Sequence, residues 1–258
     1  MTPTDGELRT TSIDVVPDGP PRLSCANGAA TITLCRPREH NRIDPDDLAV
    51  LRDHLAAVVL REDVRAVVLT GTGSATFSSG YTLQAILERL DSRFEEMLDA
   101  FESFPLPMLC ALNGSVYGGA TDLALCCDFR IGVEGTKMFM PAAKFGLHYH
   151  PGGLRRFTTQ LGPSEAKRIF LTAQTLDAET MLRIGFLNDL VARAMLQTRV
   201  DEWLAAIARC EPSVVRSMKA QIGAIAGGDR EIATTRRWYE DSLGSPELRR
   251  RLEALGKR

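Results

Sequence analysis

Two glycine turns carry the residue types best suited to chemistry in this sequence. The second turn, at Gly118-Gly119, follows an apolar run over 107–112, and from Gly119 apolar residues recur at spacings of three and four, as on a helix face. A strand that passes through glycines into a helix leaves unpaired N–H groups at the positive end of the helix dipole. Asp122 follows among apolar neighbours. The stretch is typical of a site that stabilises an oxyanion beside an ionisable group. A helix start packed in a core and capped by Asp122 is an equally good interpretation.

The first turn, Ser79-Gly80-Tyr81, repeats this arrangement. It follows an apolar run over 64–70 that is typical of a strand buried on both faces, and helical spacing resumes at Leu83. Strand, glycine turn and helix therefore occur twice, although no sequence repeat has a fixed period. The pattern favours an α/β fold built from stacked turns.

Composition narrows the function classes. A chain of 258 residues with 44% apolar residues suits one large domain or a core with an appendage. The net charge of −2 gives no electrostatic case for nucleic acid as the main partner. The six cysteines show no paired metal-ligand spacing, so we expect reduced core thiols and no metal. No apolar stretch has the length of a membrane span or signal segment, and a cytoplasmic location is expected.

Several local expectations follow from turn and charge patterns. Residues 1–12 are expected to be disordered, and a hairpin turn is expected at Asp18–Pro21. His148-Tyr149-His150 is expected in a loop, with the next helix starting at Gly162. The pair Arg155-Arg156 is expected on a solvated helix face.

Four motifs, taken together, resemble the crotonase superfamily of enoyl-CoA hydratases, isomerases and their relatives. The resemblance covers about residues 29–223 and is weak for any one motif alone. The motifs are Ala30–Pro37 with Asn41, Val64–Gly71 followed by Phe77–Gly80, Asn113–Asp128, and Thr175–Ala178 through Leu187.

The resemblance implies a crotonase-like spiral of stacked ββα turns over residues 13–195. A C-terminal helical subdomain would span 196–258 and serve assembly into a homotrimer or homohexamer. It also implies an acyl-CoA thioester as substrate, with CoA as part of that substrate and no other cofactor. The thioester carbonyl would lie between the N–H groups of Tyr81 and Gly119, which agrees with the interpretation of the two glycine turns. The Tyr81 side chain is bulkier than is common in the family and is expected to shape the acyl pocket.

The sequence departs from the hydratase pattern at the two acid/base positions. The first glutamate falls on Asp122, which keeps a carboxylate on a shorter arm and is expected to be the main acid/base group, with His150 as an optional partner. The second falls on Ala142, which cannot donate or accept a proton. His150 falls where the resemblance implies a glycine, and its imidazole is a candidate replacement. A solvated or packed structural role for His148 and His150 is the more ordinary alternative.

The resemblance also implies the residues that line the ligand. The loop with Arg38, His40 and Arg42 would pass the nucleotide end of CoA, and Lys219 is a further candidate for its phosphates. Plain solvated charge is an equally good interpretation of these four side chains. The remaining substrate-binding candidates are Ser79, Gly80, Tyr117, Gly118, Pro141 and Ala142.

The expected function is that of an enoyl-CoA hydratase/isomerase-family enzyme, a lyase or isomerase of fatty acid metabolism that acts through a stabilised enolate. The loss at Ala142 counts against a standard hydratase, because syn-hydration needs two groups on one water. Two alternatives stay open: a crotonase-fold protein that binds acyl-CoA with little catalysis, and a decarboxylase or diketone hydrolase.

Overall fold

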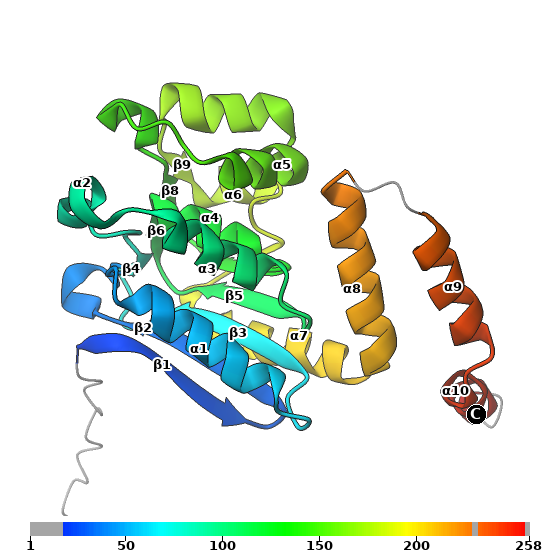
Figure 1. Cartoon of the computed structure of the whole chain (residues 1–258). Helices are drawn as coiled ribbons and strands as arrows, with labels where there is room; N and C mark the ends of the chain where they lie inside the picture. Colours follow the sequence, from blue (N-terminus) through cyan, green and yellow to red (C-terminus); the bar gives the residue numbers. More distant parts are fainter. Residues whose placement is uncertain (1–17, 229–231, 256–258) are drawn as a thin grey trace, which may run out of the picture.

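Two sheets form the centre of the computed structural model, which describes residues 18–228 and 232–255 (Figure 1). The expected disordered tail, residues 1–12, lies outside this range. The larger sheet has the order β1-β2-β3-β5-β7-β10, and the smaller has the order β4-β6-β8-β9. Their bounds are β1 Gly19–Ala26, β2 Ala29–Cys35, β3 Ala66–Gly71, β4 Thr76–Ser78, β5 Met108–Leu112, β6 Ser115–Tyr117, β7 Phe129–Val133, β8 Lys137–Phe139, β9 Leu176–Asp177 and β10 Asp189–Val191.

The helices cover both faces of the larger sheet and one end of the molecule (Figure 1). They are α1 Asp47–Val59, α2 Ile86–Arg89, α3 Ser92–Glu102, α4 Gly119–Cys126, α5 Pro151–Thr172, α6 Ala178–Arg183, α7 Leu196–Ala208, α8 Pro212–Ala226, α9 Ile232–Leu243 and α10 Pro246–Leu255. Short 3-10 turns lie at Pro37–Glu39, Leu83–Ala85, Ala142–Phe145 and Arg193–Met195.

Within residues 18–228, a ββα unit repeats three times. In each unit the first strand (β3, β5, β7) joins the larger sheet and the second (β4, β6, β8) joins the smaller one. Pairing is parallel within both sets. The chain then enters the helices α2–α3, α4 and α5 in turn. The predicted α/β spiral of stacked ββα turns is confirmed.

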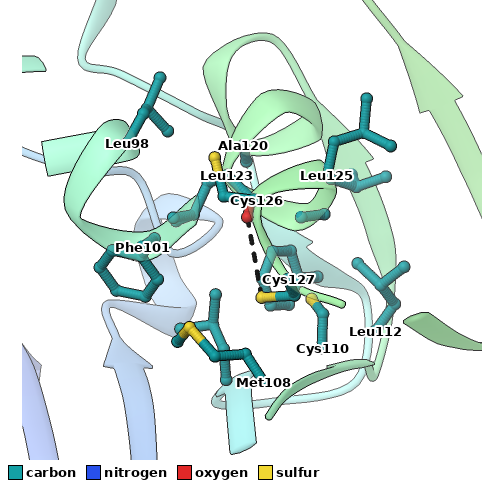
Figure 2. Close-up of a cluster of buried hydrophobic side chains, with 14 of the residues drawn as sticks. Leu98, Phe101, Met108, Cys110, Leu112, Ala120, Leu123, Leu125, Cys126 and Cys127 are labelled. Carbon is teal, nitrogen blue, oxygen red and sulfur yellow. Dashed lines mark hydrogen bonds between the residues drawn. The ribbon is translucent and has the colours of Figure 1, made fainter. Parts of the chain in front are cut away.

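The central strands of the larger sheet are buried on both faces. Val67 and Leu69 of β3 join the core beneath α1, α3 and α4, whereas Val68 joins a second cluster with Val200 of α7. Figure 2 shows the first core around α4, where the Cys127 thiol donates to the Leu123 carbonyl oxygen at 3.8 Å. This burial rigidly supports the strand ends from which the glycine turns depart.

Two local expectations were wrong and a third was incomplete. The first hairpin turns at Asn27-Gly28, where both residues have positive φ, and not at Asp18–Pro21. A helical segment does start after Gly162, as predicted, but another one that was not predicted precedes it from Pro151, and the non-helical Gly162 (φ 81°, ψ 158°) forms the kink between the two parts of α5. Arg156 is fully buried rather than solvated.

Helices α8, α9 and α10 extend away from the sheets at one side of the molecule (Figure 1). Helix α8 is attached by Lys219, whose Nζ donates to Asp128 Oδ2 at 2.6 Å and to the Leu106 carbonyl at 2.8 Å. Lys219 therefore anchors this helix, and its amino group is already occupied. Within the described residues, no helix has the length and apolar character required to span a membrane.

Candidate active site

Parallel pairing of β4, β6 and β8 brings three predicted segments together. The pairs Ser78↔Val116 and Tyr117↔Phe139 set the ends of these strands side by side. Beyond those ends lie Ser79–Tyr81, Gly118–Asp122 and Pro141–Ala142, and Tyr117 is the last residue of β6. The Gly118 N–H donates to the Phe139 carbonyl at 2.8 Å and closes the second turn against the third. The adjacency follows from strand register, because parallel strands end at one edge of a sheet.

The two glycine turns are in direct contact. A methyl group on Gly80 would lie 2.7 Å from the Tyr117 carbonyl oxygen and 2.8 Å from the Gly119 nitrogen, so only a glycine fits there. Gly80 also has φ of 86°, which disfavours any side chain. The backbone segments that carry the two candidate oxyanion donors therefore lie next to each other.

The Tyr81 N–H points away from the segment around Ile43, with which Tyr81 forms a parallel bridge. In the parallel bridge with Ile43, the Ile43 N–H donates to the Gly80 carbonyl and the Ile43 carbonyl accepts from the Thr82 N–H. The Tyr81 N–H between them points to the opposite side. The Gly119 N–H belongs to the first turn of α4, where helical bonding leaves N–H groups unpaired.

The loop at residues 38–42 is joined to the first turn. The Ser79 N–H donates to the His40 carbonyl at 2.8 Å, and His40 Nδ1 lies 3.0 Å from Thr76 Oγ1. Arg42 pairs with Glu39 and Asp44. The Arg38 side chain is 85% exposed beside Asp18 and is the more available of the two guanidinium groups.

Asp122 lies at the centre of a buried polar network. Its Oδ1 accepts from Arg156 Nε at 2.8 Å. Its Oδ2 accepts from His150 Nε2 at 2.9 Å and from the Tyr149 hydroxyl at 3.1 Å, with Arg156 Nη2 at 3.4 Å. Asp122 and Arg156 are both fully buried. The carboxylate oxygens are thus occupied by three side chains of one helix and its N-terminal loop.

Electrostatics keep Asp122 ionised. Burial opposes its charge, but the hydrogen bonds from His150 and Arg156 outweigh burial and hold the pKa of Asp122 below its usual value. Burial and the negative charge of Asp122 raise the pKa of the Tyr149 phenol well above its usual value, so that phenol stays a donor. The network therefore consists of one carboxylate, one guanidinium, one phenol and one imidazole.

His150 caps helix α5 and is oriented on both sides. Its Nδ1 accepts from the Gly153 N–H at 3.2 Å, which places the hydrogen on Nε2 facing Asp122. Glu95 Oε2 lies 3.5 Å from Nδ1. The side chain is 12% exposed, so the ring is accessible at one edge. His148 is exposed, and its Nδ1 lies 2.8 Å from the Tyr149 carbonyl, outside the network.

Sequence reasoning missed Arg156 and the acids that face it. Arg156 Nη1 contacts Asp99 Oδ1 at 3.1 Å and Glu102 Oε2 at 2.8 Å, and both acids lie on α3. Together with Glu95, they follow helical spacing along one face of α3. That row of acids was the sequence signal for a buried arginine, because acids on one face of a helix favour cations on the neighbouring helix. Arg155 also pairs with Glu102.

Ala142 and the thiols supply no further chemistry. Ala142 is 5% exposed and begins the 3-10 turn after β8, so the third segment brings no ionisable group. Among the described residues, no group of histidines, cysteines and acids is arranged to hold a metal. Burial raises the pKa of the Cys126 thiol well above its usual value, which keeps that thiol protonated. A cavity of about 370 Å³ lies elsewhere, between α7, α8 and the start of β5.

Comparison with known proteins agrees with this architecture. Residues 24–237 match the family model described as enoyl-CoA hydratase/isomerase. The crotonyl-CoA hydratase of Syntrophomonas wolfei is 29% identical over 198 residues, covering 74% of this chain and 76% of the relative. The short-chain-enoyl-CoA hydratase of Clostridium acetobutylicum is 28% identical over 225 residues, covering 83% and 84%. The structure of Pseudomonas aeruginosa DspI superposes with a TM-score of 0.85 at 29% identity, covering 97% and 98%. The predicted resemblance is confirmed, and the chain belongs to the enoyl-CoA hydratase/isomerase family.

Proposed function

We propose that this chain is an enzyme that binds an acyl-CoA thioester and forms its enolate between the N–H groups of Tyr81 and Gly119. The observation that carries the proposal is the direct contact of the two glycine turns, with an oriented imidazole at the neighbouring helix start. Preorganised amides aimed at a developing oxyanion are each worth about 3–4 kcal/mol in comparable sites. Names of two relatives, a crotonyl-CoA and a short-chain-enoyl-CoA hydratase, support a thioester ligand.

His150 is the proposed proton carrier, with Asp122 as its partner. The Nε2 hydrogen stays directed at Asp122, so the base is Nδ1, whose lone pair has to leave the Gly153 N–H. Nδ1 then removes a proton from the carbon next to the thioester carbonyl, and the electron pair of the broken C–H bond moves onto the carbonyl oxygen. The imidazolium then returns the proton to the same carbon or to a conjugated one. Ionised Asp122 stabilises the imidazolium and keeps the ring in place. Hydration is disfavoured because Ala142 brings no second acid/base group to a water.

Proton exchange tests the proposed base and the two amides together, because loss and return of the α-proton of a saturated thioester pass through the enolate. Butyryl-CoA is incubated with the protein in D2O, and deuterium incorporation at the α-carbon is followed by NMR. We expect exchange with the native chain and a loss of about 100-fold or more in His150→Gln. His148→Gln is the matched control and should exchange normally. Native exchange that persists unchanged in His150→Gln would contradict the assignment of the base.

A second candidate function is acyl-CoA binding with little turnover. It is favoured by the pairing of Asp122 with Arg156 and by the absence of an ionisable group at Ala142. Tight binding by calorimetry without any deuterium incorporation would select this candidate over the first.

We also propose contacts and an assembly for the whole ligand-binding unit. Arg38, exposed next to the first turn, would pair with phosphates at the nucleotide end of CoA. Arg38→Ala should weaken CoA binding, and the loss should be smaller at high salt.

The extended C-terminal helices would hold a homotrimer or a pair of trimers together.

A further inference from the structure

We propose that Phe94 restricts this site to short-chain acyl groups. The inference rests on the proposed function, because it concerns the acyl part of the same thioester. Phe94 lies on α3 and is 5% exposed, although the sequence gives it no obvious role beyond a helix face.

The Phe94 ring lies directly against the second glycine turn. A methyl group on Gly119 would come within 2.7 Å of Phe94 Cζ, so the ring packs onto the α-carbon of the residue that carries one oxyanion donor. The same ring makes edge contacts with Tyr81, at 5.5 Å between centroids, and with His150, at 6.2 Å. It therefore contacts the residues of both donors and of the proposed base.

This position limits the space available to the substrate. The reacting carbon has to lie between the oxyanion donors and the imidazole, and carbons further along the acyl chain must pass the same side chains. Phe94 contacts Tyr81, Gly119 and His150, so the two rings border that volume. The Tyr81 hydroxyl donates to the Arg89 carbonyl at 2.8 Å, which fixes the second ring as well. On this proposal a short acyl group would be accommodated beside these rings, whereas a long chain would require their displacement.

Helix α3 is firmly held, so displacement of Phe94 is costly. Met97, Leu98 and Phe101 are all fully buried against α1 and α4. On the other face, Asp99 and Glu102 pair with Arg156 of α5. The helix would have to break ion pairs and expose apolar surface for the ring to move away.

Binding of an acyl-CoA series tests the inference. Dissociation constants for acetyl-, butyryl- and octanoyl-CoA are measured by calorimetry on the native chain, Phe94→Ala, Phe94→Leu and Phe101→Leu. We expect the native chain to bind butyryl-CoA at least about tenfold more tightly than octanoyl-CoA. Phe94→Ala should remove or reverse this preference, with Phe94→Leu intermediate. Phe101→Leu, a substitution on the same helix away from the site, should lower the melting temperature and keep the native ratio.

The outcomes separate this inference from the proposed function. Equal binding of butyryl- and octanoyl-CoA by the native chain, or an unchanged ratio in Phe94→Leu, would overturn the role of Phe94 alone. Failure of the folded native chain to bind any of the three thioesters would overturn both.

Discussion

Asp122 accepts hydrogen bonds from three side chains, and this number decides what its carboxylate can do. An acid that transfers protons with a substrate needs a free lone pair facing that substrate. Here Arg156, His150 and Tyr149 occupy both oxygens. The negative charge of Asp122 is therefore used to orient and stabilise neighbouring groups. Our proposal gives the proton-carrying role to His150, whose Nδ1 lone pair has one longer hydrogen bond to release, from the Gly153 N–H at 3.2 Å.

Removing that charge is expected to destabilise the fold. Asp122→Asn leaves the buried Arg156 with only the α3 acids, and we expect a loss of about 3 kcal/mol in the free energy of unfolding, near the low end for a broken buried pair. Chemical denaturation monitored by circular dichroism measures this change. Lys167→Gln, at an exposed position of α5, is the control and should change stability by less than about 0.5 kcal/mol.

The same carboxylate predicts a pH dependence. Because the pKa of Asp122 is lower in the folded chain than in the unfolded one, its contribution is present above the unfolded pKa of about 4 and is lost as the pH falls through the folded value. The free energy of unfolding of the native chain should therefore fall in acid more steeply than that of Asp122→Asn. Parallel curves for the two proteins below pH 4 would contradict this.

Substitution of Gly80, compared with that of Gly135, distinguishes the effect of crowding between the two turns from the effect of backbone strain. Gly80→Ala adds a methyl group between the two turns, and we expect proton exchange to fall by about tenfold or more together with a loss of about 1–3 kcal/mol in stability. Gly135→Ala is the matched control, since Gly135 has a similar positive φ but open space around it. The control should lose stability from strain alone and keep its exchange rate.

The residue types predicted the two glycine turns of the site but did not predict the buried Arg156. The turns at Gly80 and Gly118-Gly119 were predictable because glycine pairs at strand–helix junctions have a local backbone cause. Arg156 was not, because its partners come from α3 and α4, 34 to 57 positions away in the chain. Local sequence could not distinguish a buried guanidinium from a solvated one.

At the scale of elements, the ends of helices and hairpins are set by capping and turn residues, which hydrophobic periodicity does not reveal. The helix predicted from Gly162 is present, but a helical segment that was not predicted precedes it, with His150 as its cap and Pro151 at the first helical position. Gly162, with non-helical φ and ψ directly before Pro163, separates this first segment from the predicted one within α5. The Asn27-Gly28 hairpin was recognisable from its dipeptide, a strong turn signal that competes in the sequence with the prolines at 20 and 21.

Helix α8 offers an element-level prediction. Lys219→Met removes the ion pair with Asp128 and the bond to the Leu106 carbonyl, so α8 should open more readily. Hydrogen exchange with mass spectrometry should show faster exchange in 212–226 and no change in α4. Lys167→Met on α5 is exposed and should leave both regions as in the native chain.

For the whole molecule, the two sheets share one construction rule that sequence could anticipate. Buried apolar runs over 64–70 and 107–112 predicted strands β3 and β5 of the larger sheet, and the repeated strand, glycine turn and helix predicted stacked turns, whereas the short strands β4 and β6 were not predicted. The placement of the C-terminal helices relative to the sheets could not be anticipated, because their apolar residues are not fully covered by this chain. Met218, Ile222 and Ile225 of α8 are 50%, 67% and 62% exposed.

That exposed surface predicts assembly. Light scattering after size exclusion should give a mass of about 85 kDa, three times 28.3 kDa, or twice that value for paired trimers. Ile222→Asp combined with Ile225→Asp should lower the mass toward one chain. A native chain that elutes as a monomer would contradict this expectation.

The Arg156 guanidinium of α5, which pairs with acids of α3 and α4, has a further consequence for redesign. Introducing a carboxylate with Ala142→Glu would recreate only half of a water-activating pair, because its counterpart would remain neutralised by Arg156. Conversion of this protein into a water-adding catalyst therefore demands at least two coordinated replacements, one that supplies the missing acid and one that releases Asp122 from its cation.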